Sequence, residues 1–264
     1  MNRENLVRIK QTLLDCADRF SSEELFPTLL PEALQFVLSN PYAFAIAISL
    51  DRGTKADIIW TIPYYIKNEL GFLDPVRINS MTLEETAALF SRLPKRPRYI
   101  NDAPRTLKEL TALVINKFDG DASRIWLGKS AADVINTFQS IHGVGTGIAN
   151  MAVLLIEAAY HHLNKSDFDV KPHSGTLRAF FKIFEDKSNM DIKPDTHTMR
   201  VLYRLGVAQD ISFASAIQAA RSLSPDFPGA VDGALWWIGR TWCFPTNPVC
   251  SECCAQQICA KRIN

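Results

Sequence analysis

Asp195 is the acidic residue whose neighbours say most about its chemistry. It follows Pro194 and precedes a stretch in which Met199, Leu202 and Leu205 have the spacing of one helix face. An aspartate directly before a helix accepts hydrogen bonds from the first N–H groups, so the simplest interpretation is an N-cap. A carboxylate fixed in this way is also well oriented to stabilise a positive charge or to activate water. Asp195 is therefore a candidate for both roles.

Cysteines are the second group of residues with chemical potential. Five of the six fall in one short segment, and four of these have the spacing Cys243-x6-Cys250-x2-Cys253-x5-Cys259. Four thiolates bind a [4Fe–4S] cluster or a structural zinc ion, and disulfides are the third interpretation. Zinc ribbons usually have two C-x2-C pairs, whereas this segment has one. The N-terminal stretch shows no secretory signal that would indicate an oxidising compartment.

Two cysteines fall outside this spacing. Cys254 adjoins Cys253, and we interpret it as a spare; the alternative is that it replaces one of the four ligands. Cys16 stands alone near the start, and we expect it to be a small buried apolar residue of the first helix.

A glycine-rich turn separates two stretches of helical periodicity, residues 131–141 and 148–160. Glycines adopt backbone conformations that a Cβ forbids, and they let another backbone approach closely. The second helix begins with free N–H groups and the positive end of its dipole, which suits a phosphate. The alternative is an ordinary turn between packed helices. The turn consists of Gly143, Val144, Gly145, Thr146 and Gly147.

These motifs together resemble the endonuclease III-like DNA glycosylases. The resemblance is specific over about residues 130–160 and 193–259, where the hairpin, a Val-Asp-Thr-His-like segment around Asp195 and the cysteine spacing occur in order. It implies an all-α, two-lobed helix-hairpin-helix glycosylase fold with a C-terminal [4Fe–4S] cluster loop. The cluster ligands it implies are Cys243, Cys250, Cys253 and Cys259.

The resemblance also implies a division into two domains. Residues 41–165 are expected to form a helical barrel that contains the hairpin. Residues 1–40 and 166–264 are expected to form the second domain, which contains Asp195 and the cluster loop at 243–259.

The function that the resemblance implies is removal of a damaged or mismatched base from double-stranded DNA, with Asp195 as the catalytic carboxylate. Family members that also cut the strand use a lysine in the second hairpin helix as a nucleophile. Gly147 occupies that position here, so a monofunctional enzyme is expected, unless Lys193 or Lys171 replaces the lysine. The other alternative is a protein with the same fold that binds DNA lesions without catalysis.

Arg52 and Arg240 are the expected DNA contacts outside the hairpin. Many family members have a glutamine after the helix equivalent to residues 41–50, and it fills the gap left by the extruded base. This chain has Asp51-Arg52-Gly53 there, so Arg52 is expected to take that role and Asp51 to need a partner. Arg240, just before the cysteine segment, is expected to meet a phosphate.

Two further stretches carry expectations. Residues 95–99 form the most basic loop, which suits a DNA backbone or is simply a solvated charge run. Residues 161–190 exceed the usual length between hairpin and aspartate, and we expect them to border the lesion pocket or the DNA surface. A metal site built from His161, His162 and His173 is disfavoured because no acidic partner has ligand spacing.

Composition sets the remaining limits. The 264 residues are 47% hydrophobic, and 29 basic against 28 acidic residues give a net charge of +1. A DNA-binding surface must therefore be a local patch. No apolar run approaches the roughly 18 residues of a membrane span, so we expect no membrane contact. We expect a monomer in the cytoplasm, associated with the nucleoid if the protein is bacterial.

Overall fold

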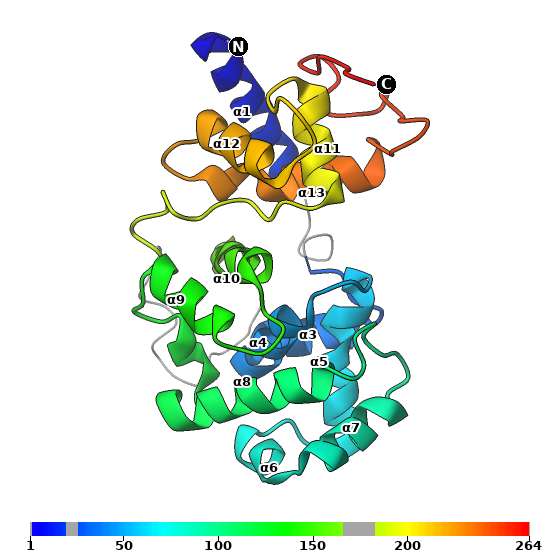
Figure 1. The fold of residues 1–264 in the computed structure, drawn as a ribbon, viewed down its shortest axis with the longest axis vertical. Helices are drawn as coiled ribbons and strands as arrows, with labels where there is room; N and C mark the ends of the chain where they lie inside the picture. Colours follow the sequence, from blue (N-terminus) through cyan, green and yellow to red (C-terminus); the bar gives the residue numbers. More distant parts are fainter. Residues whose placement is uncertain (1, 20–25, 166–182, 264) are drawn as a thin grey trace. The chain divides into compact units, whose positions relative to one another are not determined.

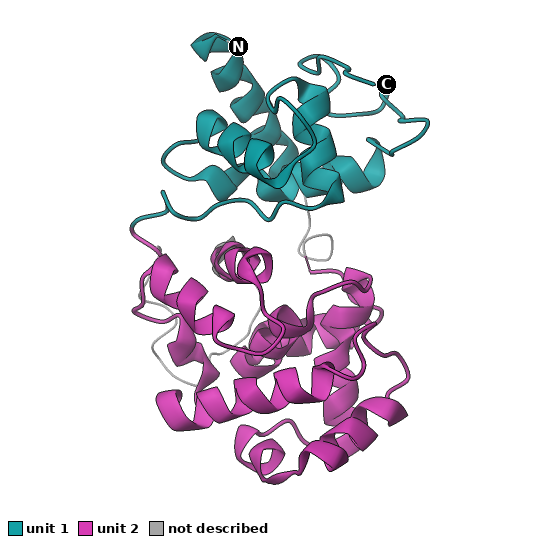
Figure 2. Ribbon diagram, in the orientation of Figure 1, with its two compact units in different colours: residues 1–21, 186–264 teal, residues 22–185 magenta. Residues whose placement is uncertain are grey.

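The computed structural model describes residues 2–19, 26–165 and 183–263, and every regular element in these stretches is a helix (Figure 1). The chain divides into two compact units. Unit 1 combines residues 1–21 with 186–264, and unit 2 comprises residues 22–185 (Figure 2). The predicted all-α class is confirmed.

Unit 2 is built around α4 (Pro41–Leu50), a short helix whose residues are all buried from Tyr42 onward. Asn40 caps it by accepting hydrogen bonds from the Tyr42 and Ala43 N–H groups. The alternation of alanine and large apolar residues would also suit a strand, and burial on all sides explains why no amphipathic pattern marks the helix. The expected buried helix is confirmed.

Most of the other elements of unit 2 pack directly against α4. Phe44 of α4 makes edge-to-face contacts with Trp60 and Trp126, whose ring centroids lie 5.4 and 6.1 Å away. Trp126 is 2% exposed, as expected for a core residue. The elements are α3 (Pro31–Ser39), α5 (Ala56–Leu70), α6 (Pro75–Ser80), α7 (Leu83–Arg92), α8 (Ala103–Phe118), the 3-10 helix η1 (Ala122–Ile125), α9 (Ala131–Gln139) and α10 (Thr146–Lys165).

Unit 1 is formed by two parts of the chain that are far apart in sequence. The N-terminal α1 packs against α12 and α13, and α11 packs against α13. Gly239 of α13 permits this close packing, because a Cβ there would lie 2.6 Å from the His197 Cβ. The elements are α1 (Arg3–Ala17), α11 (Thr196–Leu205), α12 (Phe213–Leu223), the 3-10 helix η2 (Pro228–Val231) and α13 (Asp232–Thr241).

The boundaries of the two units lie at different residues from the boundaries of the expected domains. α3 packs on α4 and α5, so unit 2 begins at residue 22 and not at residue 41. Unit 2 also extends to residue 185, which includes the buried Phe184. Within the described part of the chain, no single helix is long and apolar enough to cross a membrane.

Candidate functional site

Asp195 is the N-cap of α11, as its sequence position predicts. Its Oδ1 accepts hydrogen bonds from the N–H groups of His197 at 2.7 Å and Thr198 at 2.8 Å. The Asp195 N–H in turn donates to Thr198 Oγ1 at 2.9 Å, which completes a reciprocal capping box. Both helix N–H bonds end on the same oxygen. The second carboxylate oxygen is therefore not needed for the cap, and Asp195 is held at the helix start by two hydrogen bonds to its side chain and one from its backbone N–H.

A second carboxylate, Asp232, supports the segment that leads to Asp195. Asp232 begins α13, and its Oδ1 accepts a hydrogen bond of 2.7 Å from the Lys193 N–H. Burial raises the pKa of Asp232 to about 7, the hydrogen bond from Lys193 opposes this shift, and the negative charge of Asp195 adds to it. The pKa of the partly exposed Asp232 is thus raised towards neutral pH, and the charge of Asp195 contributes to the shift.

Arg200 connects the helix behind Asp195 to the start of the cysteine segment. Its guanidinium is buried and donates to three backbone carbonyl groups. Nε bonds to Cys243 O at 2.6 Å, and Nη2 bonds to Gly239 O at 2.9 Å. Nη1 bonds to Thr196 O at 2.8 Å, next to Asp195. One side chain thereby ties the aspartate-bearing helix to α13 and to the first cysteine.

The four cysteines of the predicted spacing are free thiols and line one cavity of unit 1. Burial raises the pKa of Cys253 and Cys259, and the charges of the neighbouring cysteines raise both further. Within the described residues, no three His, Cys, Asp or Glu side chains are arranged to hold a single metal ion. The cysteine ligands stay a prediction.

Arg204, one turn after Arg200 on α11, enters the same cavity. Its Nη1 donates to Phe244 O at 2.6 Å and lies 3.4 Å from Cys243 Sγ. Its Nη2 donates to Pro245 O at 2.9 Å. The Lys261 N–H points at Cys259 Sγ from 3.4 Å. A buried guanidinium thus lies beside Cys243 Sγ, and a backbone N–H lies beside Cys259 Sγ.

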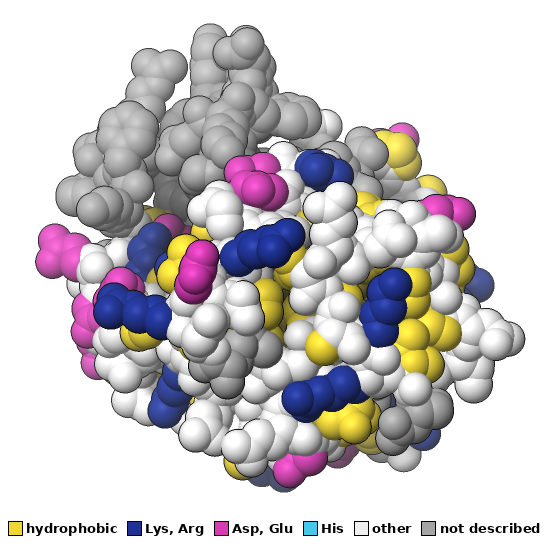
Figure 3. Space-filling model, turned by 90° about the horizontal axis from the view of Figure 1, so that it is seen from above, with side chains coloured by type: hydrophobic (Ala, Val, Ile, Leu, Met, Phe, Trp, Pro, Cys, Tyr) yellow, Lys and Arg dark blue, Asp and Glu magenta, His cyan; other side chains and the backbone are white. Residues whose placement is uncertain are grey.

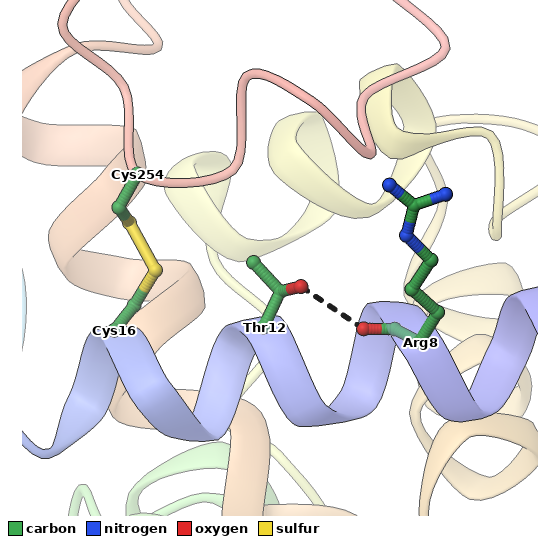
Figure 4. The surroundings of a disulfide bond; sticks show 4 residues. All are labelled: Arg8, Thr12, Cys16 and Cys254. Carbon is green, nitrogen blue, oxygen red and sulfur yellow. Dashed lines mark hydrogen bonds between the residues drawn. A yellow bond between two sulfur atoms is a disulfide. The ribbon is translucent and has the colours of Figure 1, made fainter.

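The remaining two cysteines form a disulfide, Cys16–Cys254, which joins α1 to the cysteine segment (Figure 4). Cys16 is buried as expected, at 1% exposed. Its interpretation as a mere apolar residue was wrong, because the sulfur is bonded to a residue 238 positions away. The bond also removes Cys254 from the free thiols. The four cysteines with cluster spacing are therefore the four that the disulfide leaves available.

The hairpin of unit 2 has the expected form of helix, tight turn and helix. Gly143 has a φ of 79°, a conformation that favours glycine. The Val144 N–H closes the turn by donating to Ile141 O at 3.0 Å, and the Val144 side chain is buried. Gly145 and Gly147 differ from Gly143, because a Cβ at either would meet no atom within 4 Å. They border open space at the N-terminus of α10.

The comparisons with known proteins address this arrangement. No protein-family model and no curated protein matches the sequence. A trapped covalent complex of endonuclease III with DNA matches with a TM-score of 0.58 and 18% identity, over 96% of each chain. A non-covalent endonuclease III–DNA complex matches with a TM-score of 0.59 and 19% identity, over 96% of this chain and 95% of that one. A thermostable thymine-DNA glycosylase matches with a TM-score of 0.60 and 18% identity, over 98% and 96%.

The fold is that of the endonuclease III-like DNA glycosylases. The all-helical architecture agrees along almost the whole chain, so the predicted helix-hairpin-helix glycosylase fold is confirmed. Sequence identities of 18% and 19% establish the fold alone. The reaction is inferred from the residues of the site.

Arg52 and Arg240 differ in how they are placed on this glycosylase fold. Arg240 of α13 is exposed and lies over the Trp236 ring at 5.1 Å, so it is accessible to a phosphate. The Arg52 side chain is only 21% exposed and donates to Gly143 O at 3.1 Å. Asp51 has a hydrogen-bond partner, because its Oδ2 accepts a hydrogen bond from Trp60 Nε1 at 3.3 Å. The roles of both arginines towards DNA stay predictions.

The basic loop keeps its charges at the surface, where Lys95, Arg96 and Arg98 are exposed. On the face drawn in Figure 3, Lys and Arg side chains are scattered among uncharged atoms. This agrees with the near-neutral net charge. The side chains of His161, His162 and His173 and all of Lys171 lie outside the part of the chain that the structure describes. The role of residues 161–190 therefore stays a prediction.

Sequence reasoning missed the residues that hold these groups in place. Arg200 and Arg204 occur four residues apart in a helix that also carries apolar residues, and we interpreted only the apolar spacing. Their signal is a pair of arginines on the buried face of an amphipathic helix, where an unpaired charge would be costly. Asp232 had no signal beyond its place before an apolar helix.

Proposed function

We propose that the chain is a monofunctional DNA glycosylase that hydrolyses the bond between a damaged or mismatched base and its sugar. The observation that carries this proposal is Asp195, an aspartate fixed at the start of α11 with one oxygen engaged by the helix. The glycosylase fold supports it, because the fold's solved representatives include complexes of endonuclease III with DNA. The proposed partner is double-stranded DNA, bound by a monomer.

The reaction begins with extrusion of the target nucleotide from the duplex. The C1′–N bond then breaks, the base leaves with the electron pair, and positive charge develops on the sugar. The ionised carboxylate of Asp195 stabilises this charge and takes a proton from the attacking water, whose oxygen forms the new bond to C1′. The released base takes up a proton, so charge and atoms balance.

Gly147 supports the absence of strand cleavage. Cleavage by this type of enzyme needs an amine that attacks C1′, and glycine offers none. The open space beside Gly147 shows that packing does not require glycine at this position. The product of the proposed enzyme is therefore an abasic site in an intact strand.

The four free cysteines fit a [4Fe–4S] cluster. All four line one cavity, and the Arg204 guanidinium lies 3.4 Å from Cys243 Sγ. Bound there, a cluster would act as a cross-link between four points of a segment without regular secondary structure. Iron and acid-labile sulfide in the purified protein would support this assignment, and zinc without sulfide would contradict it.

A panel of duplexes, each with one altered base, tests the reaction. The expected result is strand cleavage only after alkali treatment, for at least one duplex. Replacing Asp195 by Asn keeps the oxygen that caps α11, so the variant is expected to fold and bind DNA while base release falls about 10²- to 10⁴-fold. Retained activity in Asp195→Asn would refute the role of the carboxylate. Binding without base release across the panel would favour the non-catalytic alternative.

Gly147→Lys provides the complementary gain-of-function test. The lysine enters open space, so the variant is expected to fold normally. It is expected to cut the strand without alkali and to form a protein–DNA adduct on borohydride treatment. An adduct with the unchanged protein would instead mean that another lysine is the nucleophile.

A further inference from the structure

Arg52 follows the buried helix α4 and turns back onto the hairpin. Its Nη1 donates to Gly143 O at 3.1 Å, and its guanidinium lies over the Tyr99 ring at 5.1 Å. Its Nη2 lies 3.6 Å from Asp102 Oδ2 in an ion pair. The Nη2 atom is buried and makes no hydrogen bond, so a DNA phosphate cannot reach it while this packing persists.

Two glycines make room for this packing. A Cβ on Gly143 would lie 2.2 Å from Arg52 Nη1 and 2.4 Å from the central guanidinium carbon. A Cβ on Gly53 would lie 2.7 Å from the Tyr99 ring. Both glycines have positive φ, at 79° and 65°. The backbone on either side of Arg52 is therefore shaped to bring the guanidinium between the hairpin and the tyrosine.

The same neighbourhood includes the basic loop at residues 95–99. The Arg98 N–H donates to Thr54 Oγ1 at 2.7 Å, so the loop is joined to the turn that carries Arg52. Asp102 also contacts the hairpin directly, since its Oδ1 lies 3.4 Å from His142 Nε2. Arg52 thus has the hairpin on one side and the basic loop with its continuation on the other.

We propose that Arg52 is a positioning residue, a brace that holds the hairpin and the basic loop in one fixed arrangement and does not itself touch DNA. The Arg52 brace comprises Arg52, Tyr99, Asp102 and Gly143. This inference rests on the proposed function, because the arrangement matters only if both elements face DNA. It replaces the expectation that Arg52 fills the gap left by an extruded base.

The salt dependence of DNA binding separates a brace from a contact. A side chain that neutralises a phosphate contributes about one unit to the slope of log affinity against log salt concentration. Arg52→Met is expected to weaken binding about fivefold to tenfold, as for one lost hydrogen bond, with the slope unchanged. Arg96→Met is the matched control from the exposed basic loop, and it is expected to lower the slope. A lower slope in Arg52→Met would overturn the proposal.

Hydrogen exchange without DNA tests the brace even if the protein has no glycosylase activity. In Arg52→Met the amides of the hairpin and of the basic loop are expected to exchange several-fold faster, whereas in Arg96→Met the hairpin amides are expected to be unchanged. Unchanged hairpin exchange in Arg52→Met would overturn the proposal. Faster exchange in a protein that binds no DNA would instead refute the proposed function and leave the brace intact.

A double-mutant cycle, measured as free energies of unfolding without DNA, tests the packing of Arg52 against Gly143. Gly143→Ala places a methyl group against the guanidinium, so part of its damage is expected to disappear when residue 52 is shortened to Ala. Arg52→Lys keeps the charge but loses the planar fork, and it is expected to restore little of the hairpin protection. Additive effects of Gly143→Ala and Arg52→Ala, or full restoration by Arg52→Lys, would contradict the brace.

Discussion

The hairpin of unit 2 and the cysteine segment of unit 1 are held in place in opposite ways. The hairpin lies between two helices, and its shape depends on the positive φ of Gly143 and a backbone hydrogen bond of Val144. The cysteine segment has turns but no helix, and side chains from elsewhere hold it, chiefly Arg204 and the disulfide to Cys16.

This difference determines whether stability and function can be separated. At the hairpin, the residues that support the turn are distinct from Gly145 and Gly147, which face open space. At the cysteine segment, Arg204 both holds the loop and faces the thiols. Changes at the hairpin should therefore alter DNA binding without unfolding the unit, whereas changes around the cysteines should alter stability and cofactor retention together.

The largest effect is expected for Arg204→Ala. Three contacts are lost in a buried place, two of them hydrogen bonds to carbonyl groups. We expect unfolding to become easier by about 4 kcal/mol, since charged donors contribute about 1.5–3 kcal/mol each, and we expect most of the bound iron to be lost. Denaturant unfolding and iron content measure the two effects. Arg240→Ala, at an exposed position of the same unit, is the control; an Arg204→Ala protein with full iron and normal stability would contradict the comparison.

A smaller and pH-dependent effect is expected for Asp232→Asn. The folded-state pKa of Asp232 is raised to about 7, so its favourable neutral form is fully present below pH 4 and lost as the pH rises through 7. Asn keeps the acceptor for the Lys193 N–H and does not titrate. We expect the variant to match the unchanged protein near pH 4 and to be more stable at pH 8 by roughly 2–3 kcal/mol, which is less than the roughly 4 kcal/mol of the full shift because Asp232 is partly exposed. A stability difference that stays constant between these pH values would contradict the shift.

The smallest effect on stability is expected for Gly145→Ala. The added methyl group meets no atom within 4 Å and the residue has no positive φ, so the free energy of unfolding should change by less than about 0.5 kcal/mol. DNA affinity should nevertheless fall about tenfold if the hairpin binds a phosphate as predicted, because the methyl group would lie in the path of that phosphate. Thermal unfolding and a binding titration measure the two quantities. Comparable losses of stability and of DNA affinity would mean that the residues that support the hairpin and those that contact DNA are the same.

The sequence predicted the features that depend on local geometry. Glycine spacing predicted the hairpin, and the Pro-Asp-Thr-His segment predicted the cap at Asp195, because turns and caps are short-range structures with few solutions. The cysteine spacing identified the four thiols that the structure leaves free, although their ligand role stays a prediction.

The features that the sequence did not predict join residues far apart in the chain. Arg52 and Gly143 are 91 positions apart, Arg204 and Cys243 are 39 apart, and Cys16 and Cys254 are 238 apart. A single sequence contains no local signal for such pairs, because any exposed arginine or spare cysteine would look the same. The direction of the Arg52 side chain, in particular, depends on the space that Gly143 leaves.

The Cys16–Cys254 bond has a consequence for the order of events on the ribosome. α1 is synthesised first, yet its partners α12 and α13 and the cysteine of its disulfide come from the last part of unit 1. All of unit 2 is translated after α1 and before α12 and α13. We expect unit 2 to fold as a domain before the helices that pack against α1 have been synthesised. Formation of the disulfide must therefore wait until unit 2 and residue 254 have both been synthesised. A ribosome-stalled chain that ends before residue 254 should contain a folded unit 2 and an α1 that proteases still cut.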